Sequence, residues 1–320
     1  MNYAVEAKDL AKDHAGEHAL KGISFRVPAA SLFGIIGADG AGKSTLMNIL
    51  TTLLDPDAGS GKVLGHDLAA GFRAIRKDIG YMPRRFSLYQ DLSVGENLDF
   101  FADIFGMAGR EKAERMRYLL DFAALTPFVG RRAGLLSGGM KQKLALACTL
   151  VHHPHALFLD EPTVGVDPVA RRDFWDMLKS LRADGISMVV STPYMDEAAL
   201  CDQLILLHEG RILAQGAPAD LLREYPFALY HVEGDRALFY PGDEPPPPGL
   251  ILVYPSGGAL HAAAPRPGPA DPGSLLEGLR ARVPGAREIR PADPTVEDFF
   301  FALLSGRGPA GEGPRAKGPA

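Results

Sequence analysis

The sequence predicts an α/β protein with a mostly parallel sheet, a mainly helical subdomain and a small C-terminal α+β extension. Strand-like apolar runs alternate with helical segments between residues 156 and 210, which is typical of a parallel sheet. A buried strand at 31–37 leads into a glycine-rich turn and a helix at 42–54. After about residue 225 proline and glycine cluster, so a separate small unit is expected there.

The N-terminal elements follow from alternation and turn residues. Residues 1–30 are expected to form strands that turn at Gly16 and Gly22. The helix at 42–54 is expected to end before Asp55-Pro56. Residues 85–150 are predicted to be mainly helical, because Ser93 and Glu96 have capping-box spacing and 111–125 carries apolar residues at helical spacing. The remaining core elements are strands at 156–160, 186–192 and 203–210 and helices at 169–185 and 195–201.

These elements divide the chain into a core at 1–225, with its helical subdomain at about 85–150, and an accessory region at 226–305. The accessory region is expected to hold short strands and one helix at 274–283. Residues 306–320 have almost no apolar content, so they are predicted to be a disordered tail.

Composition narrows the classes of function. The chain has 320 residues and a formal net charge of −5, and it lacks the clustered basic residues of a nucleic-acid surface, so no nucleic-acid partner is expected. Neither a signal peptide nor an apolar run long enough to span a bilayer is visible. Cys148 and Cys201 sit in apolar stretches, as small core residues of a reducing compartment do. We therefore expect a cytoplasmic chain that reaches a membrane only through a partner.

A glycine-rich phosphate-binding pattern, G-x-x-x-x-G-K-[ST], lies at residues 37–45 between a predicted strand and a predicted helix. The loop would bind the phosphates of ATP through backbone N–H groups and the N-terminus of the helix. The lysine would reach the β- and γ-phosphates, and the following serine would hold Mg²⁺. The predicted nucleotide-binding residues of the loop are Gly37, Asp39, Gly40, Ala41, Gly42, Lys43, Ser44 and Thr45.

A second chemical feature is the apolar strand at 156–160, which ends in two acids. Asp160 at its C-terminal end can bind Mg²⁺ through water. Glu161 can orient or deprotonate an attacking water, so we assign the catalytic roles to Glu161 and Lys43. Such an acidic pair alone would indicate a solvated strand end, but after a phosphate-binding loop it indicates ATP hydrolysis.

A third motif identifies a family. Leu136-Ser137-Gly138-Gly139-Met140 precedes Asp160 and opens a helix, and it resembles the signature sequence of ABC ATPases. Residues 162–168, which include Asp167, resemble the D-loop of that family. The three motifs occur in the family's order over residues 1–225. The resemblance implies the ABC ATPase core, a P-loop NTPase fold, and a head-to-tail dimer in which each ATP lies between the phosphate loop of one subunit and the signature of the other.

A finer resemblance is to the ATP-binding subunits of ABC-2-type exporters of the drug-efflux type. It rests on residues 79–106 and 294–304, and 79–106 is especially similar to the first domain of tandem-ATPase bacterial exporters. This resemblance implies an ABC-2-type transmembrane permease as partner, a second ATP-binding subunit, and a location on the cytoplasmic face of the inner membrane. The segment after residue 84 would then hold the groove for the permease's coupling helix.

The chain departs from the family at four positions around the expected nucleotide. The family has a glutamine at position 84 and a histidine at position 193, where this chain has Arg84 and Pro193. His14 stands where an aromatic usually stacks on adenine, and Asp39 stands where the phosphate loop usually has asparagine.

Proline at position 193 offers neither a side-chain donor nor an N–H, and losing a donor to transition-state charge typically costs about 10²–10³ in rate. Arg84 would either swing away from Mg²⁺ or contact phosphate as an arginine finger does. The leading hypothesis is an exporter ATPase subunit with a degenerate site of its own and an intact signature that serves a partner. The alternatives are a regulatory nucleotide-binding module, and a soluble ABC protein of translation or DNA repair, which typically has a second ATPase domain or a coiled-coil insert not seen here.

Overall fold

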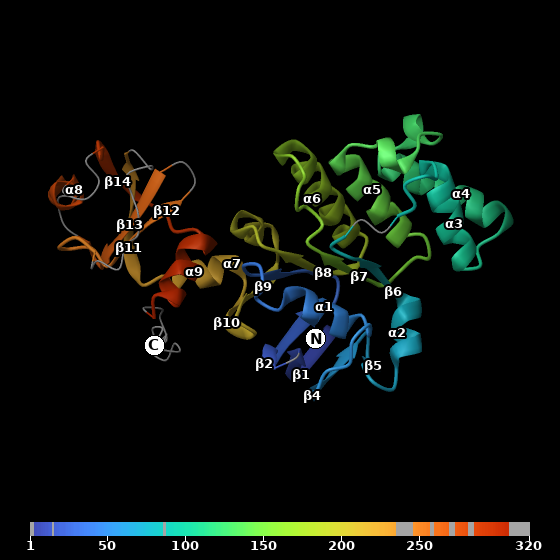
Figure 1. The fold of residues 1–320 in the computed structure, drawn as a ribbon, viewed down its shortest axis with the longest axis horizontal. Helices are drawn as coiled ribbons and strands as arrows, with labels where there is room; N and C mark the ends of the chain where they lie inside the picture. The colour runs from blue at the N-terminus through green and yellow to red at the C-terminus, as the bar shows by residue number, and fades with distance from the viewer. Residues whose placement is uncertain are drawn as a thin grey trace. The chain divides into compact units, whose positions relative to one another are not determined.

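The computed structural model describes residues 3–14, 16–85, 88–234, 246–256, 259–268, 273–280 and 285–306. The chain forms two compact units, Met1–Pro218 and Ala219–Ala320 (Figure 1). The first unit carries all the predicted nucleotide-binding residues. The tail predicted at 306–320 lies almost entirely outside the described residues.

A six-stranded sheet with the order β10-β9-β3-β8-β7-β6 forms the centre of the first unit. All neighbouring pairs are parallel except β9 and β10, which confirms the prediction of a mostly parallel sheet. Its strands are β3 (Leu32–Ile36), β6 (Ile79–Met82), β7 (Ala156–Asp160), β8 (Ser187–Thr192), β9 (Gln203–His208) and β10 (Arg211–Gly216).

A second, four-stranded antiparallel sheet has the order β2-β1-β4-β5. The strands are β1 (Tyr3–His14), β2 (Glu17–Pro28), β4 (Ala58–Val63) and β5 (His66–Asp67). The turn predicted at Gly22 is wrong, because β2 continues through it. Lys21 and Ile23 pair with adjacent residues of β1, so Gly22 is the extra residue of a bulge, and its φ of 74° suits glycine.

The helices of the first unit confirm the mainly helical character of the middle of the chain. Ser93 and Glu96 form the predicted capping box at the start of α3. Two predicted helices differ from those observed: α1 ends at Leu50, and residues 195–200 form a 3₁₀ helix. The α-helices are α1 (Lys43–Leu50), α2 (Phe72–Asp78), α3 (Val94–Ile104), α4 (Gly109–Phe122), α5 (Gly138–Thr149) and α6 (Pro168–Ala183).

The two faces of the six-stranded sheet pack against different layers. Leu157 and Leu159 of β7 belong to one apolar cluster with α3, α4, α5 and α6, whereas Phe158 belongs to a second cluster with α1 and the antiparallel sheet. This alternation is the period of a strand whose two faces are both buried. Cys148 and Cys201 are buried as predicted, and burial raises the pKa of both thiols. The sheet is thus fixed on both sides.

The second unit is an antiparallel sheet with the order β12-β13-β11-β14 and flanking helices. This arrangement agrees with the predicted α+β extension. Helix α9 was not predicted, since one helix was expected there. The elements are α7 (Pro218–Arg223), β11 (Phe227–Glu233), β12 (Leu252–Ser256), β13 (Ala259–Pro265), α8 (Gly273–Arg280), β14 (Glu288–Ala292) and α9 (Val296–Leu304).

Across the described parts of both units, no helix combines the length and the apolar character that crossing a bilayer would need.

Candidate nucleotide-binding site

The site lies at one edge of the six-stranded sheet, where the parallel strands end. Asp160 of β7 is in register with Ser191 of β8, and Ile36 of β3 is in register with Thr192. The four segments that follow β3, β6, β7 and β8 therefore meet at the same edge, which is where open α/β sheets bind ligands. These segments carry the phosphate loop, Arg84, Glu161 and Pro193.

Close packing explains two glycines of the phosphate loop. A Cβ on Gly37 would lie 2.2 Å from the backbone oxygen of Leu207, and Gly42, with φ 104°, would place a Cβ 2.5 Å from the backbone oxygen of Ala19. Both positions therefore exclude any larger residue. Gly42 is also the N-cap residue of α1, so the backbone N–H groups of the first turn of α1 remain available to an anion.

Lys43 is almost completely buried, at 3% exposure, and its ammonium is fully engaged. Its Nζ donates to the backbone oxygens of Gly37 at 2.7 Å and Ala38 at 2.9 Å. It also forms an ion pair with Oε1 of Glu161 at 3.1 Å. The two residues predicted to be catalytic are thus in contact with each other.

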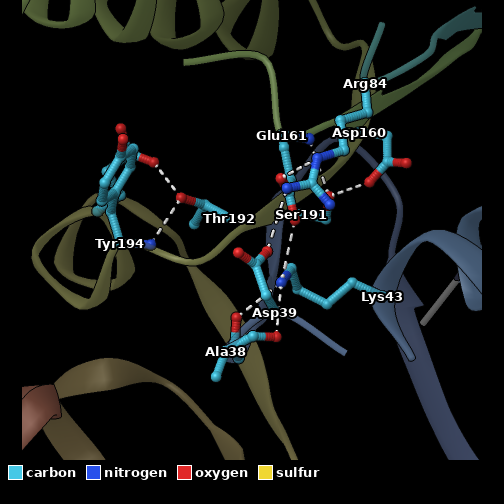
Figure 2. Close-up of polar contacts among 11 residues, drawn as sticks. Ala38, Asp39, Lys43, Arg84, Asp160, Glu161, Ser191, Thr192 and Tyr194 are labelled. Carbon is cyan, nitrogen blue, oxygen red and sulfur yellow. Dashed lines mark hydrogen bonds and ion pairs between the residues drawn. The ribbon is translucent and has the colours of Figure 1, made fainter. Parts of the chain in front are cut away.

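Arg84 occupies the other oxygen of the same carboxylate. Its Nε lies 2.7 Å from Oε2 of Glu161, and its Nη2 lies 3.2 Å from Oδ1 of Asp39. Figure 2 shows Lys43, Asp39 and Arg84 grouped around Glu161. The sequence analysis expected Arg84 either to swing away from Mg²⁺ or to contact phosphate, and neither expectation included these two ion pairs. The Glu161 carboxylate is only 1% exposed, so water does not solvate its charge. Its two cations therefore offset the cost of burying that charge.

The backbone at Glu161 is held in an unusual conformation. Its φ is 50°, in the left-handed region that costs a non-glycine residue about 1–2 kcal/mol. Its N–H donates to the backbone oxygen of Ser191 at 3.1 Å and lies 2.9 Å from Ser191 Oγ, which in turn donates to Oδ1 of Asp160 at 2.5 Å. The end of β8 therefore fixes both acids at the end of β7.

The described residues enclose a pocket of about 640 Å³ beside the phosphate loop. Its volume lies in the range typical of small-molecule sites. It is lined by Gly16, Glu17, His18, Ala19, Lys21, Gly40, Gly42, Lys43, Ser44, Thr45, Arg84, Glu161 and Glu209. Six of the predicted nucleotide-binding residues line it: Gly40, Gly42, Lys43, Ser44, Thr45 and Arg84. The other predicted residues do not: His14, Gly37, Asp39, Ala41, Asp167 and the signature residues Ser137, Gly138 and Gly139.

The predicted metal ligands fit a hard cation by their chemistry. Ser44 lines the pocket, and Asp160 directly precedes Glu161, which also lines it. Oxygen donors of this kind are those that Mg²⁺ prefers. His14 ends β1, and its Nε2 lies 3.5 Å from Thr45 Oγ1, so its exposed ring stands next to the start of α1.

The signature residues start helix α5. Ser137 is its N-cap, with Oγ accepting from the backbone N–H of Met140 at 3.3 Å. Asp167 caps α6 in the same way, with Oδ1 accepting from the N–H groups of Val169 at 3.1 Å and Ala170 at 3.0 Å. Both residues therefore have a structural role in this chain besides the nucleotide contact that the resemblance implies.

The two signature glycines differ in their surroundings, and this gives a testable contrast. A Cβ on Gly139 would lie 2.5 Å from Cβ of Ala170, whereas one on Gly138 would have its nearest neighbour 3.6 Å away. Gly139→Ala should destabilise the chain by about 1–3 kcal/mol through overpacking between α5 and α6. Gly138→Ala should leave the free energy of unfolding within about 0.5 kcal/mol. Urea unfolding of both variants measures this, and equal losses would contradict the contrast.

Sequence analysis missed a buried carboxylate that organises the segment containing Pro193. Glu197 is 2% exposed. Its Oε2 accepts hydrogen bonds from Thr163 Oγ1 at 3.1 Å and from Thr192 Oγ1, and its Oε1 accepts from Arg171 Nε at 3.1 Å. These contacts join the ends of β7 and β8 to α6. In the sequence, Glu197 is only one of two adjacent acids, so no signal separated it from exposed Asp196.

The guanidinium of Arg171 completes this network. It lies over the ring of Tyr194, 4.2 Å from the centroid, and also pairs with Asp196 at 3.1 Å. The N–H of Tyr194 donates to Thr192 Oγ1 at 3.1 Å (Figure 2). Pro193 thus lies between two anchored residues, although its own ring offers no hydrogen bond. Ser191 was also missed, because an apolar run gives no sign that one hydroxyl reaches the neighbouring strand.

Comparison with known proteins agrees with this geometry. Residues 20–164 match the ABC transporter family. The chain is 39% identical over 303 residues to the probable multidrug ABC transporter ATP-binding protein YbhF of Escherichia coli, covering 88% of this chain and 48% of that protein. It is 38% identical over 307 residues to the Nod factor export ATP-binding protein I of a Rhizobium species, covering 94% and 96%. The chain spans about half the length of the Escherichia coli relative.

Solved structures show the same core. The cbiO1 protein of Clostridium perfringens, part of the cbiONQ ABC transporter complex, superposes with a TM-score of 0.65 at 28% identity, over 70% of this chain and 92% of that one. A dimeric ATP-binding cassette in a post-hydrolysis state bound to ADP and Pi superposes with a TM-score of 0.61 at 27% identity, over 67% and 98%. With a phosphate loop, a strand-end acid pair and a signature helix in the fold of these structures, this chain belongs to the ATP-binding proteins of ABC transporters.

Proposed function

We propose that the chain is the ATP-binding subunit of an ABC-2-type exporter, with a degenerate site of its own and an intact signature that completes the site of a second ATPase subunit. One observation carries the proposal. At the predicted catalytic Glu161 a cation, Arg84, takes one carboxylate oxygen, whereas Ser137 to Gly139 begin α5 with regular capping geometry. The catalytic carboxylate of this chain is therefore altered in its surroundings, whereas its signature segment is regular.

ATP binding follows from the loop and the pocket. The backbone N–H groups after Gly42 and the ammonium of Lys43 would hold the phosphates, and the pocket beside them has room for the rest of a nucleotide. Ser44 and Asp160 would hold Mg²⁺, which would neutralise phosphate charge when bound. His14, next to Thr45, would stack on the base, and Glu161 would accept a proton from water once its two cations turn to the phosphates.

Two residues support slow hydrolysis at this site. Pro193, which directly follows β8, has no hydrogen to donate to the γ-phosphate where the family has a histidine. Arg84 stands where the family has a glutamine, and its guanidinium, which pairs with Glu161 here, has no oxygen to offer to the metal. Hydrolysis in the transporter would therefore depend on the partner's site, which this chain's Ser137, Gly138, Gly139 and Asp167 would complete.

Permease docking is supported by an apolar groove. A pocket of about 230 Å³ is lined by residues of β6, α3 and α5 and of the segments that follow them, among them Met82, Phe101 and Phe105. His152 stacks on Phe105 at 3.8 Å, and burial lowers its pKa. An amphipathic helix of an ABC-2-type permease would fit such a surface. The chain would thereby be held at the cytoplasmic face of the inner membrane.

The test is the ATPase rate of the chain together with its partner ATPase subunit. Ser137→Ala in this chain should reduce the turnover of the pair by about 10²-fold, because the partner's bound ATP loses a donor to its developing charge. The same substitution removes a helix cap, which costs about 1 kcal/mol of stability. Ser93→Ala removes a comparable cap from α3 and is the matched control, for which turnover should stay within twofold.

A regulatory nucleotide-binding module is the second candidate, and the ion pair that Arg84 forms with Glu161 favours it. Such a module would take no part in hydrolysis. An ATPase rate of the pair that is unaffected by Ser137→Ala would therefore reject the transporter mechanism proposed above and support this second candidate.

A further inference from the structure

The two cations that hold Glu161 are the two cations that a γ-phosphate would need. Lys43 Nζ lies 3.1 Å from one oxygen of Glu161, and Arg84 Nε lies 2.7 Å from the other. Both cations line the phosphate pocket with Glu161, and Figure 2 shows them on either side of its carboxylate. Each oxygen of the carboxylate therefore lies in an ion pair with a cation.

From this geometry we infer that Arg84 is a substrate-gated cap on Glu161, which the γ-phosphate of ATP removes and ADP does not. The inference rests on the proposed function, since it requires ATP in this pocket. A terminal phosphate carries more charge than one carboxylate and accepts a guanidinium fork at two oxygens. It therefore competes with Glu161 for Arg84 and Lys43, and Glu161 is released when the substrate has arrived.

Arg84 also forms a second ion pair, with Asp39 of the phosphate loop. The Nη2–Oδ1 distance is 3.2 Å, and the side chains of Arg84 and Asp39 are 46% and 72% exposed. Exposed pairs of this kind contribute little on their own, so the contact with Asp39 does not compete seriously with Glu161 or with phosphate. It would keep the guanidinium beside the phosphate loop when it leaves Glu161. Asp39 and Arg84 both depart from the family's usual residues, and the structure joins them in one ion pair.

The inference predicts a specific defect in nucleotide discrimination. In Arg84→Gln the affinity for a non-hydrolysable ATP analogue should fall about tenfold, whereas the affinity for ADP should stay within twofold. The adjacent Arg85, which is also exposed, provides the control: Arg85→Gln removes the same charge and should change neither affinity. Displacement of a fluorescent ADP derivative measures both dissociation constants without turnover, and thermal unfolding checks that each variant is folded.

A double-variant cycle with Glu161→Gln identifies the competitor. Removing the carboxylate charge should tighten binding of the ATP analogue several-fold when Arg84 is present, and clearly less in Arg84→Gln/Glu161→Gln. A ratio of analogue to ADP affinity that Arg84→Gln leaves unchanged would overturn the cap, as would an equal effect of Glu161→Gln with and without Arg84. If the unmodified chain binds neither nucleotide, the proposed function fails, and the cap fails with it.

Discussion

Replacing Pro193 by histidine should raise the ATP turnover of the chain by about 10²-fold, because one donor to developing γ-phosphate charge is worth about 10²–10³ in rate. Position 193 directly follows β8, and both of its neighbours are anchored. The N–H of Tyr194 donates to Thr192 Oγ1, and the guanidinium of Arg171 lies over the ring of Tyr194. A histidine there starts from an ordered backbone. Steady-state release of phosphate at saturating MgATP measures the effect.

The control for this substitution is Pro193→Ala, which also removes the ring but adds no side-chain donor. Its turnover should stay close to that of the unmodified chain. If both variants gain equally, relief of the proline constraint explains the increase, and the missing donor does not.

Replacing Glu197 by alanine should lower the free energy of unfolding by about 3–5 kcal/mol, the usual result of breaking a buried charged pair from one side. Arg171, whose side chain is 19% exposed, would lose a buried partner, and the hydroxyls of Thr163 and Thr192 would lose their acceptor. Trp175, the single tryptophan of the chain, is buried in α6 of the same unit. Urea unfolding followed by its fluorescence therefore reports on this network.

Asp196→Ala provides the matched control. Asp196 contacts the same guanidinium but its side chain is 74% exposed, so its loss should cost less than about 1 kcal/mol. Similar losses for Asp196→Ala and Glu197→Ala would show that burial of Glu197 does not anchor the segment around Pro193.

Much of the fold could be predicted because its signals are local. The strand at 156–160 is a continuous apolar run between turn residues, and Ser93 with Glu96 marks the start of α3 by spacing alone. The wrong predictions arose where packing between elements determines the local structure. The bulge at Gly22 depends on pairing with β1, and α1 ends at Leu50, before the apolar pattern of 42–54 does. Helix α9 was missed although Thr295 and Asp298 form a capping box there.

The site was predictable as a set of motifs but not as a set of contacts. The sequence predicted that Lys43 and Glu161 belong to an ATP site, because each stands in a recognisable pattern. That Arg84 pairs with Glu161 depends on the order of β6, β7 and β3 in the sheet, which no local pattern contains. The same holds for Ser191 and Glu197, whose partners lie 31 and 34 positions away in Asp160 and Thr163.

The central claim is that this chain binds ATP in a site that is poor at hydrolysis on its own. The most direct test is the steady-state turnover of the purified, unmodified chain at saturating MgATP, with nucleotide binding measured on the same preparation. The account predicts clear binding with a turnover well below ~1 s⁻¹, the lower end of ordinary enzyme rates. Robust turnover of about 1 s⁻¹ or more by the chain alone would contradict it.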